Sequence, residues 1–175
     1  LRVIAAAISQ KLTKKEKAKI ESEVSRNVDV LFKNSILRKD EDKLSYYEIF
    51  EQCYPLHPIS ALILPILCQK IAQNERTLFS YLGSFEPNGF LDSLSHLEDV
   101  REWILPHSLY DYFVQNQPMA VIDQLAMRRW AEIETAVERL GDAPEKEVNL
   151  VKTIGLLNLI GAQGNFRASK KLLNT

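Results

Sequence analysis

Arg76 and His57 are the two side chains in this sequence whose type and position could do chemistry on a bound ligand. Arg76 lies in Gln73-Asn74-Glu75-Arg76-Thr77, near a predicted helix start, where a planar guanidinium can reach a phosphate group held by a neighbouring domain. A surface arginine paired with Glu75 or another carboxylate is the alternative. His57 stands between two prolines and could bond a nucleotide phosphate or ribose, or be a structural histidine satisfied inside the protein.

The motifs of a self-sufficient enzyme are absent from the sequence. It contains no GxxxxGK[ST] or GxGxxG loop, no HExxH and no GxSxG, and its carboxylates are scattered over amphipathic faces without an acid/base pair. Cys53 and Cys68 lie in apolar patterns outside any CxxC pair, and the three histidines fit no zinc spacing. We therefore predict no catalytic residue, no metal site and two buried, reduced thiols, with a disulfide as the alternative.

Charge and hydropathy predict a cytoplasmic protein without a membrane partner. The 22 Lys and Arg against 23 Asp and Glu give a net charge of −1, so no global field attracts nucleic acid or membrane. The longest apolar run, 59–67, is shorter than the about 20 residues that span a bilayer, and the start carries no signal-peptide cleavage pattern. Because Leu1 begins in mid-helix, we expect a piece of a longer chain.

Helical periodicity dominates and strand patterns are nearly absent, so the predicted fold class is all-α. Thr13 and Glu16 form a capping box that starts a helix to about Leu37. The apolar stripe of this helix is Ile20, Val24, Val28, Leu31 and Phe32. Ser45-Tyr46-Tyr47-Glu48 is expected to be a second capping box, and Pro55 should end the helix that it starts.

Prolines and glycines divide the rest of the chain. Pro58 suits the first turn of a helix, and Pro65 inside that helix should kink it or begin it afresh. Residues 83–89 are a clear turn, and Pro106 should close the segment before it. The inward residues expected after Pro58 are Leu62, Ile66, Ile71, Leu78, Phe79 and Leu82. Those expected in a long helix at 119–140 are Val121, Ile122, Leu125, Trp130, Ile133 and Val137.

Gly141-Asp142-Ala143-Pro144 is the predicted domain boundary. It is followed by a helix at 145–160 and by a last helix that Ser169 caps. We expect a helical N-terminal segment at 1–43, a helical domain at 44–140 and a third part at 145–175.

Three segments resemble a block in large bacterial P-loop ATP-binding proteins, many of them associated with phage defence or DNA processing. The segments are Tyr54-Pro55-Leu56-His57-Pro58, Ala72-Gln73-Asn74-Glu75-Arg76-Thr77-Leu78-Phe79-Ser80-Tyr81-Leu82 and Leu109-Tyr110-Asp111-Tyr112-Phe113. In those proteins the block follows the nucleotide-binding core and is similar to the helical lid of AAA+ and initiator-type (STAND or ORC-like) ATPases.

The resemblance implies a multi-helix lid that closes over ATP and Mg²⁺, which are held mainly by an upstream ATPase core outside this sequence. Arg76 matches the "sensor 2" arginine that contacts the terminal phosphates, with His57 as a second nucleotide-sensing residue. The implied hinge and lid motif comprises Tyr54, Pro55, Pro58, Asn74, Glu75 and Thr77. The family's phosphate-binding loop and acidic metal-binding strand are absent here, so this chain alone should not hydrolyse ATP.

The C-terminal part is similar to the start of a winged-helix domain, at 152–161 and 164–169. It would be truncated here, and its Arg167, Lys170 and Lys171 could bind nucleic acid with a steep salt dependence. The expected partners are the upstream core and other subunits of a defence or DNA-processing complex. A helical interaction scaffold, docking a partner through 110–113 and the helix at 119–140, is the alternative function without a nucleotide.

Overall fold

A computed structural model of the chain describes residues 1–38, 40, 42–71, 75–116, 124–161 and 166–173. These residues form helices joined by loops, which confirms the all-α prediction, and the described part contains one isolated bridge but no strand. The helices are α1 (Arg2–Ala7), α2 (Lys14–Lys33), α3 (Lys43–Gln52), α4 (Pro58–Ile71), α5 (Glu75–Gly83), α6 (Phe90–Ser95), α7 (Pro106–Asn116), α8 (Gln124–Arg139), α9 (Glu145–Ile160) and α10 (Lys170–Leu173).

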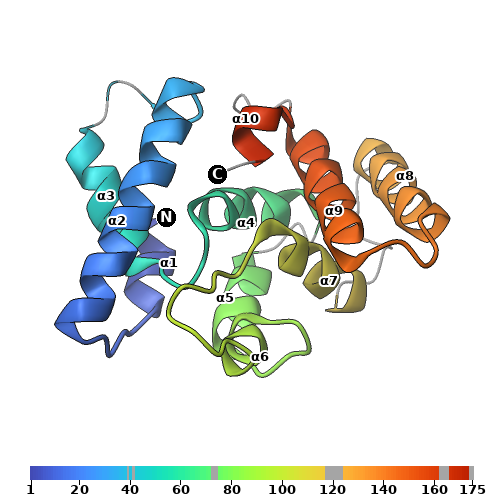
Figure 1. The fold of residues 1–175 in the computed structure, drawn as a ribbon. Helices are drawn as coiled ribbons and strands as arrows, with labels where there is room; N and C mark the ends of the chain where they lie inside the picture. Colours follow the sequence, from blue (N-terminus) through green and yellow to red (C-terminus); the bar gives the residue numbers. More distant parts are fainter. Residues whose placement is uncertain (39, 41, 72–74, 117–123, 162–165, 174–175) are drawn as a thin grey trace.

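Helix α4 lies at the centre of the bundle, with α1, α2 and α3 on one side of it and α7, α8 and α9 on the other (Figure 1). It packs against α2, α5, α7 and α9. A helix that is apolar nearly all round has to be covered on several faces. Its buried residues are Pro58, Ile59, Ser60, Ala61, Ile63, Leu64, Leu67, Cys68 and Ile71.

The predicted start of α2 is confirmed, but its predicted end is wrong. The Glu16 amide donates to Thr13 Oγ1 at 3.4 Å and the Thr13 amide donates to Glu16 Oε2 at 2.8 Å, which is the expected capping box. The helix ends at Lys33, about one turn before Leu37. Asn34 Nδ2 donates to the Val30 carbonyl at 2.7 Å, and this side-chain bond competes with continuation of the helix.

The predicted second capping box is also wrong. Helix α3 begins at Lys43, because the Asp42 side chain accepts a bond of 3.1 Å from the Leu44 amide. Aspartate caps a helix as well as serine does. Asp42 therefore starts the helix before Ser45, which lies inside it.

Pro58 and Pro106 both lie in the first turn of a helix, whereas Pro65 lies inside one. Pro58 begins α4 as predicted, and α4 continues through Pro65. Pro106, however, begins α7 and does not close a preceding helix. Proline is tolerated at the first helical position because no N–H donor is needed there. Since proline can also follow the end of a helix, a proline in the sequence does not by itself show whether a helix starts or ends at that point.

Two residues predicted to face the core are exposed. Phe79 is 58% exposed and Leu125 is 60% exposed. In α5 the buried side is formed by Thr77, Tyr81 and Leu82. In α8 it is formed by Ala126, Trp130 and Ile133, whereas Val121 and Ile122 lie outside the described residues.

Helix α9 has the bounds that the sequence predicts, Glu145–Ile160. It packs closely on α8, because a Cβ atom at Gly155 would lie 2.6 Å from Ile133 Cγ2. Ser169 Oγ accepts from the Leu172 amide at 3.3 Å, which confirms the predicted cap of α10. The domain boundary at 141–144 stays a prediction.

Both cysteines are buried and free, as predicted. Burial raises the pKa of the Cys53 thiol to about 11 and that of Cys68 to about 12. At neutral pH both are therefore protonated and poorly nucleophilic. None of the described helices combines the length and the apolar character that a membrane-spanning helix requires.

Replacing Tyr81 with phenylalanine is expected to raise the free energy of unfolding by about 1 kcal/mol. The Tyr81 hydroxyl is buried and has no hydrogen-bond partner among the described residues, so its desolvation is uncompensated. Tyr112→Phe is the matched control, since the Tyr112 hydroxyl donates to Glu86 Oε2 at 2.6 Å and its removal should destabilise the protein. Urea denaturation of both variants checks this. A loss of stability in Tyr81→Phe would contradict it.

Candidate functional site

The Tyr54–Pro58 segment is a fixed joint between α3 and α4. The His57 amide donates to the Ile104 carbonyl at 3.1 Å, and the Ile104 amide donates to the Pro55 carbonyl at 2.8 Å. Leu56 and Ile104 thereby form a parallel bridge, and the Tyr54–Pro55 peptide is cis. The segment is held by backbone bonds to a loop far away in the sequence.

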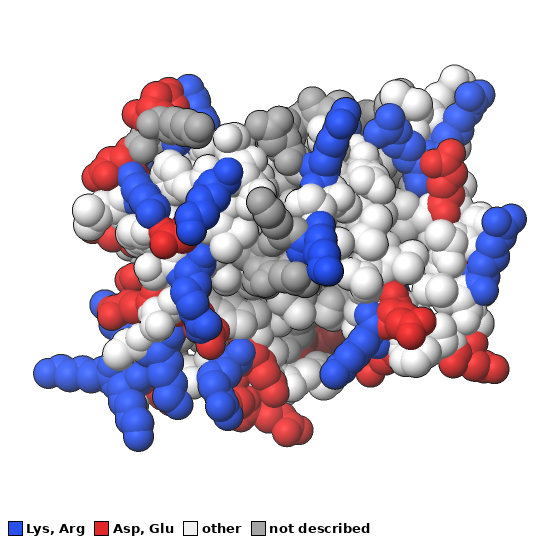
Figure 2. Space-filling view, turned by 45° about the horizontal axis from the view of Figure 1, so that its top comes forward, with Lys and Arg blue, Asp and Glu red and all other residues white. Residues whose placement is uncertain are grey.

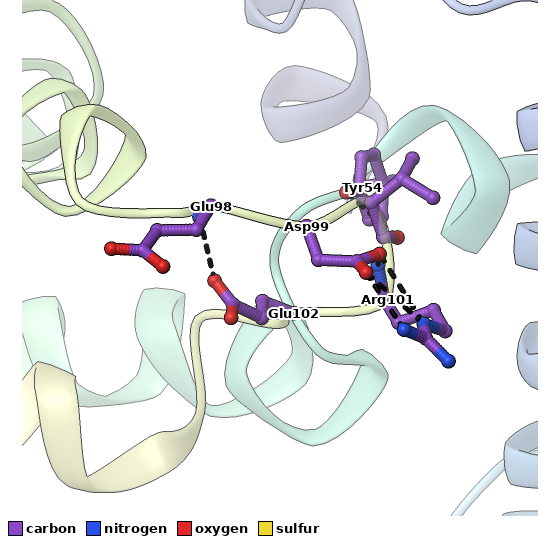
Figure 3. A network of polar contacts seen from close by, with 6 residues as sticks. Tyr54, Glu98, Asp99, Arg101 and Glu102 are labelled. Atoms are coloured by element: carbon purple, nitrogen blue, oxygen red, sulfur yellow. Dashed lines mark hydrogen bonds and ion pairs between the residues drawn. The ribbon is translucent and has the colours of Figure 1, made fainter.

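The side chain of Tyr54 fixes the same loop. Its hydroxyl donates to the Val100 carbonyl at 3.0 Å, and its ring meets that of Trp103 edge to face with centroids 5.0 Å apart. The loop is also bonded to itself (Figure 3): the Glu98 amide donates to Glu102 Oε2 at 2.8 Å. Arg101 pairs with Asp99 at 2.8 Å, and these bonds lower the pKa of Asp99 to about 2.

His57 is buried at 4% exposure, with both ring nitrogens engaged inside the protein. The Ile59 amide donates to Nδ1 at 3.3 Å, and Nε2 lies 3.0 Å from Nδ2 of Asn27. Burial lowers the pKa of His57 to about 4, so the ring is neutral at pH 7. This geometry favours the structural role of His57 over a bond to a nucleotide.

A polar cleft of about 580 Å³ lies between α2 and this joint. Its carboxylates are already bonded: Glu23 Oε2 accepts from Trp103 Nε1 at 2.7 Å, and Asp29 pairs with Lys43. Arg26 and Lys33 add positive charge to the wall. The cleft could hold a polar ligand, but the described residues contain no acid/base pair in it and no metal-binding cluster.

Arg76 is exposed in the first turn of α5 and lies away from this cleft. It follows the end of α4 that is remote from His57, and the 14 residues of α4 span about 20 Å. The structure therefore does not bring the two predicted nucleotide-sensing residues to one site.

The other residues of the predicted lid motif are packing residues where the structure describes them. Tyr54, Pro55, Pro58 and Thr77 are buried. Asn74 and the side chain of Glu75 lie outside the described part of the chain.

The aromatic segment at 110–113 cannot be the predicted docking surface, because Tyr110, Tyr112 and Phe113 are all at most 5% exposed. The Tyr110 ring stacks on Trp130 and the Tyr112 ring meets Tyr81 edge to face. These rings form the core between α5, α7 and α8. That part of the scaffold prediction is wrong.

The C-terminal basic residues lie on the surface but are not part of a continuous positively charged surface. Arg167 and Lys170 are exposed, and the side chain of Lys171 is outside the described part. Figure 2 shows Lys and Arg side chains spread over the face that it presents, with Asp and Glu side chains among them towards both edges. Such mixing weakens long-range attraction of a nucleic acid.

Comparison with known proteins identifies no relative: no family model, no curated protein and no solved structure matches the chain. The geometry of the described residues is thus what supports a function.

The pairs that build the joint were not predictable from the sequence. Asn27 and His57 are 30 positions apart, and Glu23 and Trp103 are 80 apart. Neither pair has a spacing that marks it. A local signal exists elsewhere, on α7: His107 and Asp111 are four residues apart and share a face, so the sequence could have marked them as a polar pair.

Proposed function

We propose that this chain is the helical lid region of a P-loop ATPase, in which Arg76 contacts the terminal phosphates of ATP bound by another part of the parent protein. The observation that carries the proposal is the exposure of Arg76 in the first turn of α5. The likeness of its flanking residues to the lids of AAA+ and initiator-type ATPases supports it. Phage defence or DNA processing would be the setting, with the upstream core as partner.

Helix α5 is suited to transmit a contact made by Arg76. Thr77, next to it, is buried, as are Tyr81 and Leu82 on the following turn. Helix α5 packs on α4 and α6. A force on the guanidinium would therefore move the packed helices together. ADP lacks the terminal phosphate, so lid closure would depend on the nucleotide state.

Arg76→Ala in the full-length protein is expected to lower kcat for ATP hydrolysis about a hundredfold, because one charged contact to the transferring phosphoryl group is lost. Arg76→Lys should recover part of the rate, since it keeps the charge but not the planar fork. Arg128→Ala, an exposed arginine on α8, is the control and should leave the rate unchanged. A wild-type rate for Arg76→Ala would exclude the sensor role.

A helical interaction scaffold is the second candidate, now restricted to the outer face of α8. Leu125 is 60% exposed there, and Met127, 38% exposed, lies on the opposite flank of the buried side. An exposed leucine could supply apolar contact area at the core of an interface. Binding of a partner that Leu125→Glu abolishes, without dependence on nucleotide, would favour this function over the lid.

For the C-terminal part we propose that α9 and the segment after it are the start of a winged helix that binds DNA. Arg167, Lys170 and Lys171 would contact phosphates. Each phosphate contact makes binding more dependent on salt, so DNA affinity should fall steeply between 50 and 200 mM salt. DNA binding that is absent, or that salt does not change, would exclude this role.

A further inference from the structure

A groove of about 290 Å³ runs along one face of α9, between the start of α7 and α10. Lys146, Asn149, Thr153 and Leu157 line it from α9 and recur every three or four residues, so they share one side of the helix. Ligand pockets usually enclose roughly 300–1,000 Å³, and this groove lies at the lower limit of that range, so it suits a small molecule and not a protein segment.

The polarity of the groove changes along its length. Lys146 and Asn149 lie at the start of α9, and Leu157 lies eleven positions after Lys146, about 16 Å further along the helix. At that far end Leu157, Ile59 and Leu172 are all at most 4% exposed. One end can therefore bond a polar group, and the other presents an apolar floor.

The charge of the lining has one sign. Lys146 carries the one full charge among the described residues that line the groove. It lies in the first turn of α9, where the free backbone N–H groups favour an anion. Two nearby carboxylates, Glu145 and Asp111, line the neighbouring cleft, which His107 and Asn149 also border. Asp111 is paired there with Lys152, whose Nζ donates to it at 2.7 Å.

His107 supplies a hydrogen-bonding group at the polar end. Its ring is half-buried, lines the groove, and makes no hydrogen bond to another described residue. Asp111, Glu145 and Lys152 are the charged groups that act on it, and burial lowers its pKa. A neutral imidazole offers one N–H donor to a ligand oxygen.

We infer that this groove binds a small amphipathic carboxylic acid of the medium-chain fatty acid type. The carboxylate would lie at Lys146 and His107, and the hydrocarbon tail would extend over Leu157 and Leu172. The inference is independent of the proposed lid function, since it requires no nucleotide and no ATPase core.

Calorimetric titration of the 175-residue chain with sodium decanoate tests the inference. We expect one decanoate to bind, with methyl NMR shifts at Thr153, Leu157 and Leu172. Lys146→Ala should weaken decanoate about fivefold, the usual size of an exposed charge contact, and leave 1-decanol unchanged. Equal weakening of the acid and the alcohol would overturn the assignment of the charged end.

A second pair of variants tests the position of the ligand in the groove without disturbing the core. Leu150 lines the groove and is 45% exposed, so Leu150→Glu should preserve the fold while placing a like charge beside the ligand. We expect about tenfold weaker binding of decanoate. Leu125→Glu on α8 is the matched control and should have no effect. Absent binding, or methyl shifts confined to residues outside the groove, would overturn the inference.

Discussion

Trp130→Ala is expected to lower the free energy of unfolding by about 4 kcal/mol. The Trp130 side chain is 2% exposed, its ring stacks on Tyr110 with centroids 5.2 Å apart, and its Nε1 donates to Glu134 Oε1 at 3.1 Å. Truncation leaves a cavity between α7 and α8 and removes the stacking. Guanidinium denaturation followed by circular dichroism measures the change.

Arg128→Ala is the control for Trp130. Arg128 is exposed on the same helix, so its loss should change the free energy of unfolding by less than about 0.5 kcal/mol. A lower denaturant slope in Trp130→Ala would indicate that α8 detaches before the rest unfolds. A loss below about 1 kcal/mol with an unchanged slope would contradict the packing of Trp130 on Tyr110.

Acidification from pH 7 to pH 5 is expected to cost about 2 kcal/mol of stability through His57 alone. The ring is buried and neutral, and burial lowers its pKa from 6.5 to about 4. The unfolded chain therefore takes up a proton near pH 6.5, whereas the folded protein resists protonation down to about pH 4. The stabilisation is present above pH 6.5 and is lost as the pH falls through this window.

His57→Gln isolates this contribution. The variant should be less stable at pH 7 and should depend less on pH between 7 and 5. His107, whose pKa burial also lowers, acts in the same direction in both proteins, and Glu51, whose pKa burial raises, acts in the opposite one. An unchanged pH slope in His57→Gln would show that His57 is not the titrating group.

Features determined by neighbouring residues were predictable from the sequence. The capping box of Thr13, the cap at Ser169 and both ends of α9 depend on contacts within a few positions, and they are confirmed. The end of α2 and the start of α3 failed for a local reason as well. Asn34 and Asp42 compete with the signals at Leu37 and Ser45, and hydrogen bonds to nearby backbone groups decide the outcome.

Features determined by distant contacts were not predictable. Phe79 and Leu125 fit an apolar pattern, but none of the described helices covers them, and the pattern does not show which positions are covered. In the same way, the burial of His57 depends on its contact with Asn27 of α2. The lining of the α9 groove comes from four helices, α4, α7, α9 and α10, so no short motif marks it.

The two backbone hydrogen bonds between the Tyr54–Pro58 joint and Ile104 affect how motion of the protein can be measured. Because Pro55 and His57 are both held, α3 and the start of α4 cannot swivel about the peptide that links them without breaking two hydrogen bonds. A spectroscopic label on the outer face of α2, which packs on both helices, would therefore report the orientation of α4. Movement of the central helix α4 can therefore be followed from a label placed on the surface of the protein.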